Sequence, residues 1–492
     1  HRDLHSFPTR RSSDLPLRSF SKKLYLGIVD PDKNFDELFE SLKKQYNYKH
    51  IIKVLISEQS YLEWLPKFSK IKKAAPFKQE EDHIDLSNIE VVTFEQLEKQ
   101  LQTAPIQDIL KLILIVGFNS NSSDIHIEPS ENNARIRFRV DGVLHEVAEI
   151  TKEHYNYLLS QIELNSDLKL NVDYPQDGRF SIILNNMNLS VRIETMPTMH
   201  GDDVALRLFN TQSALLKIHD LGLSDHVKPK LEHALSRPNG MILVVGPTGA
   251  GKTSTIYAIL NELNSEEVKI VTLEDPVEYE LPGITQSQIN EGDSFADRLK
   301  AVLREDPNII MVGEIRDANT AQTALQAALT GHLLISTLHA NNAVTAITRL
   351  VDMVNDPIVV TASTNIIISQ RLVRIICPDC KQGYQPSQYE KEEIKTILSG
   401  MSEDIRPREP FHFYQGKGCN KCHGLGYRGR TGIFEILLLS DKLEKLINAK
   451  TSIIELEKVA VGEGMITMEQ DGLLKAIRGL TTVTEVLKTI KE

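Results

Sequence analysis

The sequence has few cysteines, few aromatic residues and no long apolar segment. Its 492 residues include four cysteines and one tryptophan, and aromatic residues make up 6% of the chain. Four cysteines in so long a chain do not fit the disulfide scaffold of a small secreted protein. The longest apolar candidates, 110–118 and 241–245, are far shorter than the roughly 18 residues that a membrane-spanning helix needs. We therefore expect no membrane span.

Positive charge is also scarce. Lys and Arg number 56 against 67 Asp and Glu, giving a formal net charge of −11. This balance argues against a broad nucleic-acid-binding face, although a local basic patch remains compatible with it. The 41% hydrophobic and 25% charged content is ordinary for a globular protein, and the length predicts about three or four domains.

The first 22 residues stand apart from the predicted fold. The chain begins with His1, and residues 1–15 are rich in Arg and Ser without helical or strand periodicity. The string HRDLHSFPTRRSSDL is similar to translated sequencing-adapter sequence, and no apolar segment follows it as in a targeting peptide. We interpret residues 1–22 as a cloning or assembly artefact, or as disordered.

The apolar pattern divides the rest of the chain into units. A first αβ unit is expected to alternate strands at 24–29 and 51–56 with helices at 35–46 and from 59. A Lys- and Glu-rich linker separates it from a second unit, which we expect to open with a helix at 106–118. The predicted domains are a truncated N-terminal αβ domain (23–70), a linker (71–104), a second N-terminal domain (105–215), an α/β core (216–373), a cysteine-bearing insert (374–435) and a C-terminal helical region (436–492).

A phosphate-binding loop follows the apolar run 241–245. Residues 246–253 read GPTGAGKT, and the helix-like stretch 254–260 comes next. In this pattern main-chain N–H groups converge on phosphate oxygens at the positive end of a helix. We expect Lys252 to reach the β- and γ-phosphates and the Thr253 hydroxyl to bind Mg²⁺, whereas a plain Gly-rich turn would leave Lys252 unexplained. The predicted nucleotide-binding residues are Gly246, Pro247, Thr248, Gly249, Ala250, Gly251, Lys252, Thr253 and Ser254.

Carboxylates follow two further strands of a predicted parallel α/β sheet. Apolar runs 270–273, 309–312 and 333–337 alternate with helical stretches, as in a sheet whose strands bind ligands at their carboxyl ends. Glu274 ends the first run and opens the segment EDPVEYE, and Glu314 follows the second in GEIRD. Such carboxylates position metal and water, and we expect Glu314 to polarise the attacking water. Acidic loop caps without a catalytic role remain an alternative.

Two histidines, His332 and His339, flank the run 333–337. A single histidine is more often structural than catalytic. A pair bracketing a strand of the same sheet favours a role for His339 in sensing the γ-phosphate.

The four cysteines form two CxxC pairs. Cys377 and Cys380 are separated from Cys419 and Cys422 by 38 residues, 381–418. Two such pairs fit tetrahedral thiolate coordination of a structural Zn²⁺, with redox pairs or an iron–sulfur cluster as alternatives. The separation exceeds that of a compact zinc ribbon, so we expect the insert to have secondary structure of its own.

These motifs together resemble a known family. GPTGAGKTS, VTLEDPVEYEL, MVGEIRD and ALTGHLLISTLH are similar to the Walker A, Asp, Walker B and His boxes of the GspE/PilB-type secretion ATPases, the hexameric motors of type II secretion and type IV pili. SDIHIEP, RFRVDG and QDGR resemble the second N-terminal domain of that family, so the resemblance covers residues 105–492. It implies an α/β fold with a RecA-like P-loop ATPase core, an N-terminal α+β (PAS-like) domain, a tetracysteine zinc insert and a C-terminal helical region.

The resemblance also implies the members of the site. The predicted catalytic residues are Lys252, Arg192, Arg207, Glu274, Glu314 and His339. The two arginines would come from the second N-terminal domain and neutralise charge on the γ-phosphoryl group, although ordinary salt-bridged arginines are the alternative. Gly313 occupies the position at which a generic Walker B motif has Asp. Mg²⁺ would therefore rely on Thr253 and water, with Glu274 or Glu314 in its outer shell.

The implied function is an Mg²⁺-dependent ATPase that uses ATP, Mg²⁺ and Zn²⁺. It would assemble as a cytoplasmic homo-hexamer at the inner membrane and power (pseudo)pilus assembly in type IV pilus biogenesis or type II secretion. The implied partners are a GspF/PilC-like platform protein and a membrane-anchored GspL/PilM-like adaptor, with no direct nucleic acid. A RecA-like ring motor that translocates DNA, and a scaffold that binds nucleotide without hydrolysis, remain alternatives.

Overall fold

The structure is a computed structural model of the chain. It describes residues 14–20, 23–28, 50–55, 83–85, 93–170, 172–184, 187–209, 216–290, 292–403, 405–408 and 410–491. The chain divides into two compact units, His1–Glu81 and Asp82–Glu492. Among the helices in the described ranges, none has both the length and the apolar character needed to cross a membrane.

The described part of the first unit is a three-stranded sheet in the order β1-β2-β3. Strand β2 (Lys23–Ile28) runs parallel to β3 (His50–Leu55), close to the two predicted strands. Strand β1 (Asp14–Phe20) pairs antiparallel with β2 although it lies within the segment that the sequence analysis excluded. Main-chain pairing of this kind requires no apolar periodicity, so this strand was not expected from the residue pattern. The two predicted helices of this unit lie outside the described residues.

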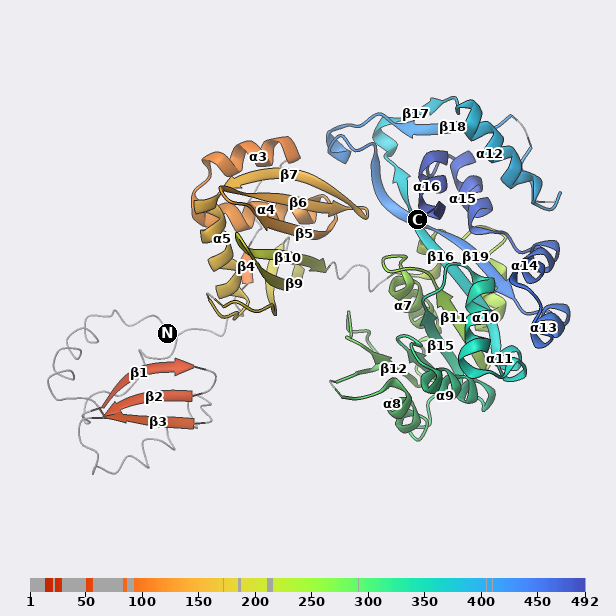
Figure 1. Ribbon diagram of the computed structural model, residues 1–492, viewed down its shortest axis with the longest axis horizontal. Helices are drawn as coiled ribbons and strands as arrows, with labels where there is room; N and C mark the ends of the chain where they lie inside the picture. Colours follow the sequence, from red (N-terminus) through yellow and green to blue (C-terminus); the bar gives the residue numbers. More distant parts are fainter. Residues whose placement is uncertain are drawn as a thin grey trace. The chain divides into compact units, whose positions relative to one another are not determined.

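The second unit begins with a seven-stranded sheet in the order β4-β8-β9-β10-β5-β6-β7 (Figure 1). Except for the parallel pair of β4 with β8, its neighbouring strands are antiparallel. The strands are β4 (His83–Asp85), β5 (Ser122–Pro129), β6 (Asn133–Val140), β7 (Val143–Thr151), β8 (Gln176–Leu184), β9 (Met187–Thr198) and β10 (Gly201–Phe209).

Three helices share one apolar core with this sheet: α3 (Phe94–Thr103), α4 (Ile109–Asn119) and α5 (Lys152–Asn165). Helix α3 and strand β4 lie in the stretch 71–104 that the sequence analysis assigned to a linker. Helix α3 is polar apart from Phe94, at its start, and Leu97 and Leu101, which are one helical turn apart and fully buried. A segment with so narrow an apolar stripe resembles a solvated linker in sequence, and only its packing shows that it is a helix of the domain.

The remaining chain is built on a second seven-stranded sheet, in the order β13-β12-β14-β15-β11-β16-β19. All neighbours are parallel except β16 and β19. The strands are β11 (Gly240–Val245), β12 (Ile270–Glu274), β13 (Thr285–Gln288), β14 (Ile309–Val312), β15 (Leu333–Leu338), β16 (Thr364–Ile376) and β19 (Tyr427–Leu438).

Both faces of this sheet are covered, which explains its uniformly apolar strands. Along β11, Leu243 packs into the cluster formed with α8 (Phe295–Val302), α9 (Ala318–Leu329), α10 (Ala343–Val354) and the helices that follow. Its neighbours Ile242 and Val244 pack on the other face with α6 (Lys228–Leu235) and α7 (Lys252–Leu263). The predicted RecA-like α/β core is therefore present, with its central strands between two layers of helices.

The antiparallel pair β16–β19 continues the core sheet into the cysteine-bearing insert. The predicted boundaries at 373/374 and 435/436 fall inside these two strands rather than between domains. Between the strands lie β17 (Lys381–Tyr384), α12 (Gln388–Ser399) and β18 (Phe413–Gly416), grouped beyond one end of the pair in Figure 1. The insert thus has the secondary structure that the long CxxC separation predicted.

The chain ends in helices α13 (Asp441–Asn448), α14 (Ile453–Gly462), α15 (Met468–Ile477) and α16 (Val483–Lys491). One main-chain hydrogen bond to a buried carboxylate and one ion pair attach them to the β16–β19 pair. Asp471 and Lys475 form a fully buried pair at 2.8 Å, and Asp471 also accepts the main-chain N–H of Phe434 on β19. Arg374 on β16 donates to Glu485 on α16 at 2.9 and 2.7 Å. The helical region is therefore anchored to the sheet.

Candidate nucleotide-binding site

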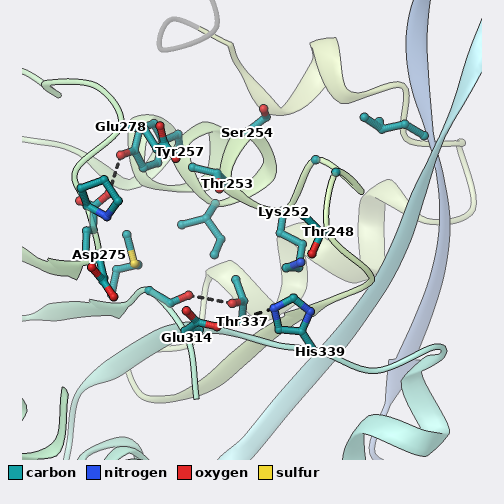
Figure 2. A pocket seen from close by; sticks show the side chains of 18 of the residues that line it. Thr248, Lys252, Thr253, Ser254, Tyr257, Asp275, Glu278, Glu314, Thr337 and His339 are labelled. Carbon is teal, nitrogen blue, oxygen red and sulfur yellow. Dashed lines mark hydrogen bonds and ion pairs between the residues drawn. The ribbon is translucent and has the colours of Figure 1, made fainter. Parts of the chain in front are cut away.

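A pocket of about 520 Å³ opens at the carboxyl ends of β11, β12, β14 and β15. This is where parallel α/β sheets bind ligands, and the volume suits a small molecule. Figure 2 shows Lys252 at the start of α7, Glu314 after β14 and His339 after β15 projecting toward the same space. The structure therefore brings together the phosphate-binding loop, the GEIRD carboxylate and the second of the two histidines.

The phosphate-binding loop depends on glycine at two points. Gly251 precedes α7 as its N-cap with φ +84°, a left-handed conformation that other residues adopt only with strain. A Cβ on Gly246 would lie 2.5 Å from the carbonyl oxygen of Gln370 on β16. The Gln370 amide in turn donates to the carbonyl oxygen of Ala250 at 2.7 Å. Strand β16 therefore supports the loop from outside the motif.

Lys252 is half-buried at the start of α7. Its ammonium donates to the carbonyl oxygens of Gly246 and Pro247 at 3.0 and 2.9 Å. Burial lowers the pKa of Lys252, and the charge of Glu314 acts in the opposite direction. A phosphate anion in the loop would give the Lys252 ammonium a negatively charged hydrogen-bond partner in place of these neutral carbonyls.

Glu314 lies between two cationic or ionisable groups. Its carboxylate forms an ion pair with Arg316, which also lies 3.7 Å from Asp275. On its other side, Nε2 of His339 is 3.6 Å from Oε2 of Glu314. The Glu314 side chain is 18% exposed, so solvent can reach it through the pocket. A solvent-accessible carboxylate at this edge of the sheet is chemically suited to accept a proton from water.

Glu274 occupies a different environment, buried at the end of β12. Its carboxylate accepts hydrogen bonds from Tyr257 Oη at 2.5 Å, Thr272 Oγ1 at 2.6 Å and Gln286 Nε2 at 3.1 Å. Burial and the bond to Glu274 raise the pKa of Tyr257. Three donors leave this carboxylate few lone pairs for a metal shell, and the bonds from Tyr257 and Gln286 tie α7 and β13 to β12 beside the pocket.

The two predicted arginines lie opposite each other on adjacent strands. Arg192 on β9 pairs in register with Arg207 on β10, and Arg192 also pairs with Arg179 on β8. Arg207 makes an ion pair of 3.2 Å with Asp124, and Arg192 lies 3.8 Å from Glu194. Like charges directly opposite in a sheet repel, so this row of guanidinium groups favours an anion.

Glu278 lines the pocket and interacts electrostatically with both arginines. Burial raises the pKa of Glu278, while the charges of Arg207 and Arg192 lower it.

His332, the other histidine flanking β15, is not among the pocket residues. Its Nδ1 lies 3.1 Å from the carbonyl oxygen of Ala327 at the end of α9, which gives it a structural role.

Some pocket residues had no motif to indicate them. Leu372 on β16 and Arg430 on β19 line the pocket, although they lie more than a hundred positions beyond the phosphate-binding loop. The contact between Arg316 and Glu314 was likewise missed, even though both belong to the GEIRD segment. The spacing of two positions in a loop does not determine whether two side chains meet.

The four cysteines converge as predicted. Their sulfur atoms all lie within 4.8 Å of one another. The closest pairs are Cys419–Cys422 at 3.7 Å and Cys377–Cys419 and Cys380–Cys422 at 3.9 Å, which are too long for disulfides. Zn–S bonds of about 2.3 Å in a tetrahedron place sulfurs about 3.8 Å apart, so the donor set fits zinc. The main-chain N–H of Gly426 also donates to the sulfur of Cys422 at 3.3 Å.

The fold and the pocket define a P-loop nucleotide-binding protein with a RecA-like core. Residues 99–488 match the family described as Type II/IV secretion system protein, and the chain belongs to that family.

Characterised relatives agree with this assignment. The chain is 42% identical over 401 residues to the type II secretion system ATPase E of Vibrio cholerae serotype O1, an alignment covering 81% of this chain and 78% of that protein. It is 36% identical over 482 residues to the type IV pilus assembly ATPase PilB of Myxococcus xanthus, covering 96% and 83%. The solved structure of the pilus retraction motor PilT with bound ADP aligns over 77% of this chain and 96% of that one, with 26% identity and a TM-score of 0.51.

Proposed function

We propose that this protein is an Mg²⁺-dependent ATPase that powers pilus or pseudopilus assembly, in type IV pilus biogenesis or type II secretion. The observation that carries the proposal is the convergence of Lys252, Glu314 and His339 on one pocket. The names of the relatives, which include secretion and pilus assembly ATPases, support the same activity.

Each of these side chains has a distinct role in the proposed reaction. Lys252 binds the β- and γ-phosphates when ATP replaces its carbonyl partners. Glu314 orients the attacking water and accepts its proton, and His339 stabilises that carboxylate and contacts the γ-phosphate. The Thr253 hydroxyl is the group that would bind Mg²⁺, which supplies charge neutralisation at the phosphates. Glu274 acts indirectly, by fixing the wall of the pocket.

Arg192 and Arg207 complete the proposed site. Their row of guanidinium groups is suited to the negative charge that develops on the transferred phosphoryl group. We further propose that the protein works as a cytoplasmic homo-hexamer at the inner membrane. A membrane platform protein and a membrane-anchored adaptor would be its partners.

Replacing Arg207 with Ala is expected to lower kcat about 10²-fold, with smaller changes in the affinity for ATP. The control is Arg135→Ala, because Arg135 lies on the same sheet and pairs with Glu128 away from the row. Steady-state phosphate release at saturating ATP measures both variants. Equal activities for the two variants would contradict a role for Arg207 at the phosphates.

The cysteine cluster is proposed to hold one structural Zn²⁺. Removing one thiolate with Cys380→Ser is expected to release the metal and to loosen the segment between β16 and β19. Elemental analysis should find about one zinc per chain in the parent and much less in the variant, and proteolysis should cut the variant first within the insert. The control is Ser402→Ala, an exposed position of the same insert. Absence of zinc from the parent protein would refute the assignment.

A DNA-translocating ring motor is the second candidate, since it would share the RecA-like core. The net charge of −11 disfavours it. Phosphate release measured with and without single- and double-stranded DNA separates the two functions. We expect unchanged turnover on adding DNA, and a several-fold stimulation would favour the translocase.

A further inference from the structure

Glu435 is a buried carboxylate that the proposed mechanism does not use. It lies on β19, and its side chain is 5% exposed. Burial raises the pKa of Glu435 to about 7, the Glu457 and Glu469 carboxylates act in the same direction, and the N–H of Ala343 acts against them. Burying a carboxyl group costs free energy, so its presence at this point needs a reason.

Glu435 accepts main-chain N–H groups at the start of two helices, from Met468 of α15 and from Ala343 of α10, and the second bond concerns the pocket. Its Oε1 accepts the main-chain N–H of Ala343 at 2.8 Å, and Ala343 is the first residue of α10. The N–H groups in the first turn of a helix have no partner within the helix. The Asn342 side chain accepts one of them, from Thr345 at 2.7 Å. Glu435 satisfies another from outside the helix and thereby fixes where α10 begins.

The start of α10 is also the end of a catalytic loop. Residues 339–342 connect β15 to α10, and the loop begins with His339. Arg349, one turn or more into α10, donates to the carbonyl oxygen of His339 at 2.6 Å. The four-residue loop is therefore held to α10 at one end by Arg349, while Glu435 holds α10 itself to the sheet.

The β16–β19 pair thus supports two parts of the pocket. Glu435 lies opposite Ser369 in the register of the two strands, and the next residue, Gln370, is the one that donates to the phosphate-binding loop. Side chains from one strand pair therefore contact both the loop that contains Lys252 and the helix that follows His339.

We propose that Glu435 is a positioning residue that holds His339 against Glu314 by fixing the first turn of α10. This inference rests on the proposed ATPase function, because its effect is exerted on hydrolysis. A misplacement of the His339 loop by a fraction of an ångström to 1 Å would lower the rate of the chemical step without removing the contacts that bind ATP.

The test compares Glu435→Leu with Glu435→Gln in the full chain. Leucine removes the acceptor, and we expect kcat to fall about 10- to 100-fold while KM for ATP changes less than about 3-fold. Glutamine keeps an oxygen for Ala343, and we expect kcat within about 3-fold of the parent. Where the leucine variant does not fold, Glu435→Asp, which shortens the side chain, takes its place with the same expected loss of kcat.

The matched control is Glu485→Gln. Glu485 is also buried, but its partner is Arg374, away from the His339 loop. The Glu485→Gln substitution should lower the melting temperature and leave kcat within about 2-fold of the parent.

Three results would each overturn the inference: a folded Glu435→Leu protein with parental kcat, equal losses for Gln and Leu, or a change confined to KM. A parent protein without ATPase activity would instead show that the proposed function itself is wrong.

Discussion

Lys252→Ala is expected to abolish ATP hydrolysis, with a loss of at least about 10³-fold in kcat/KM. The ammonium group is the one cation that the phosphate-binding loop itself carries, and it donates to the neutral carbonyl oxygens of Gly246 and Pro247. Alanine removes the charge that would bind the β- and γ-phosphates but leaves the main-chain cradle in place. The fold should therefore survive.

The matched control for this variant is Lys300→Ala. Lys300 lies on α8 of the same core, is 60% exposed and pairs with Asp297. Phosphate release should stay at the parental level in the control, and circular dichroism should show both variants folded. Undiminished hydrolysis by folded Lys252→Ala would end the assignment of residues 246–253 as the phosphate-binding loop.

Glu314→Gln should separate binding from hydrolysis. Glutamine has nearly the same shape as glutamate, but it cannot accept a proton from water, so kcat should fall about 10²- to 10⁴-fold. Affinity for a fluorescent ATP analogue should be unchanged or higher, because the residues of the phosphate-binding loop are untouched. The loss of charge also removes the ion pair with Arg316 and alters the contact with His339, so small rearrangements of both side chains are expected.

Glu305→Gln provides the comparison for Glu314. Glu305 is 69% exposed and pairs with Lys269 on the protein surface. Hydrolysis should be parental in this control. If Glu314→Gln lost nucleotide affinity and turnover together, the carboxylate would be a binding group and the proposed role in activating water would be wrong.

The central strands of the core could be predicted closely from the sequence. The runs 241–245, 270–273, 309–312 and 333–337 each became a strand with little change of bounds. Strands buried on both faces of a parallel sheet are continuously apolar, so they contrast sharply with the polar loops that follow. The phosphate-binding loop was also predictable, because its glycines and Lys252 are close together in the sequence and their spacing alone identifies the motif.

Features that depend on distant partners could not be predicted. The antiparallel pair β16–β19 joins residues about 60 positions apart, and the insert between them concealed that both strands extend the core sheet. The short apolar stripe of Leu97 and Leu101 gave too weak a signal for a domain helix. The donors around Glu274 and the role of Glu435 at α10 likewise arise only when separate elements pack together.

Release of phosphate from ATP by the unaltered protein tests the central claim most directly. The account predicts turnover that saturates with ATP, requires Mg²⁺ and stops when the metal is chelated. Tight binding of ATP with no phosphate release, in a folded and fully assembled preparation, would contradict it and identify a scaffold that binds nucleotide without hydrolysing it.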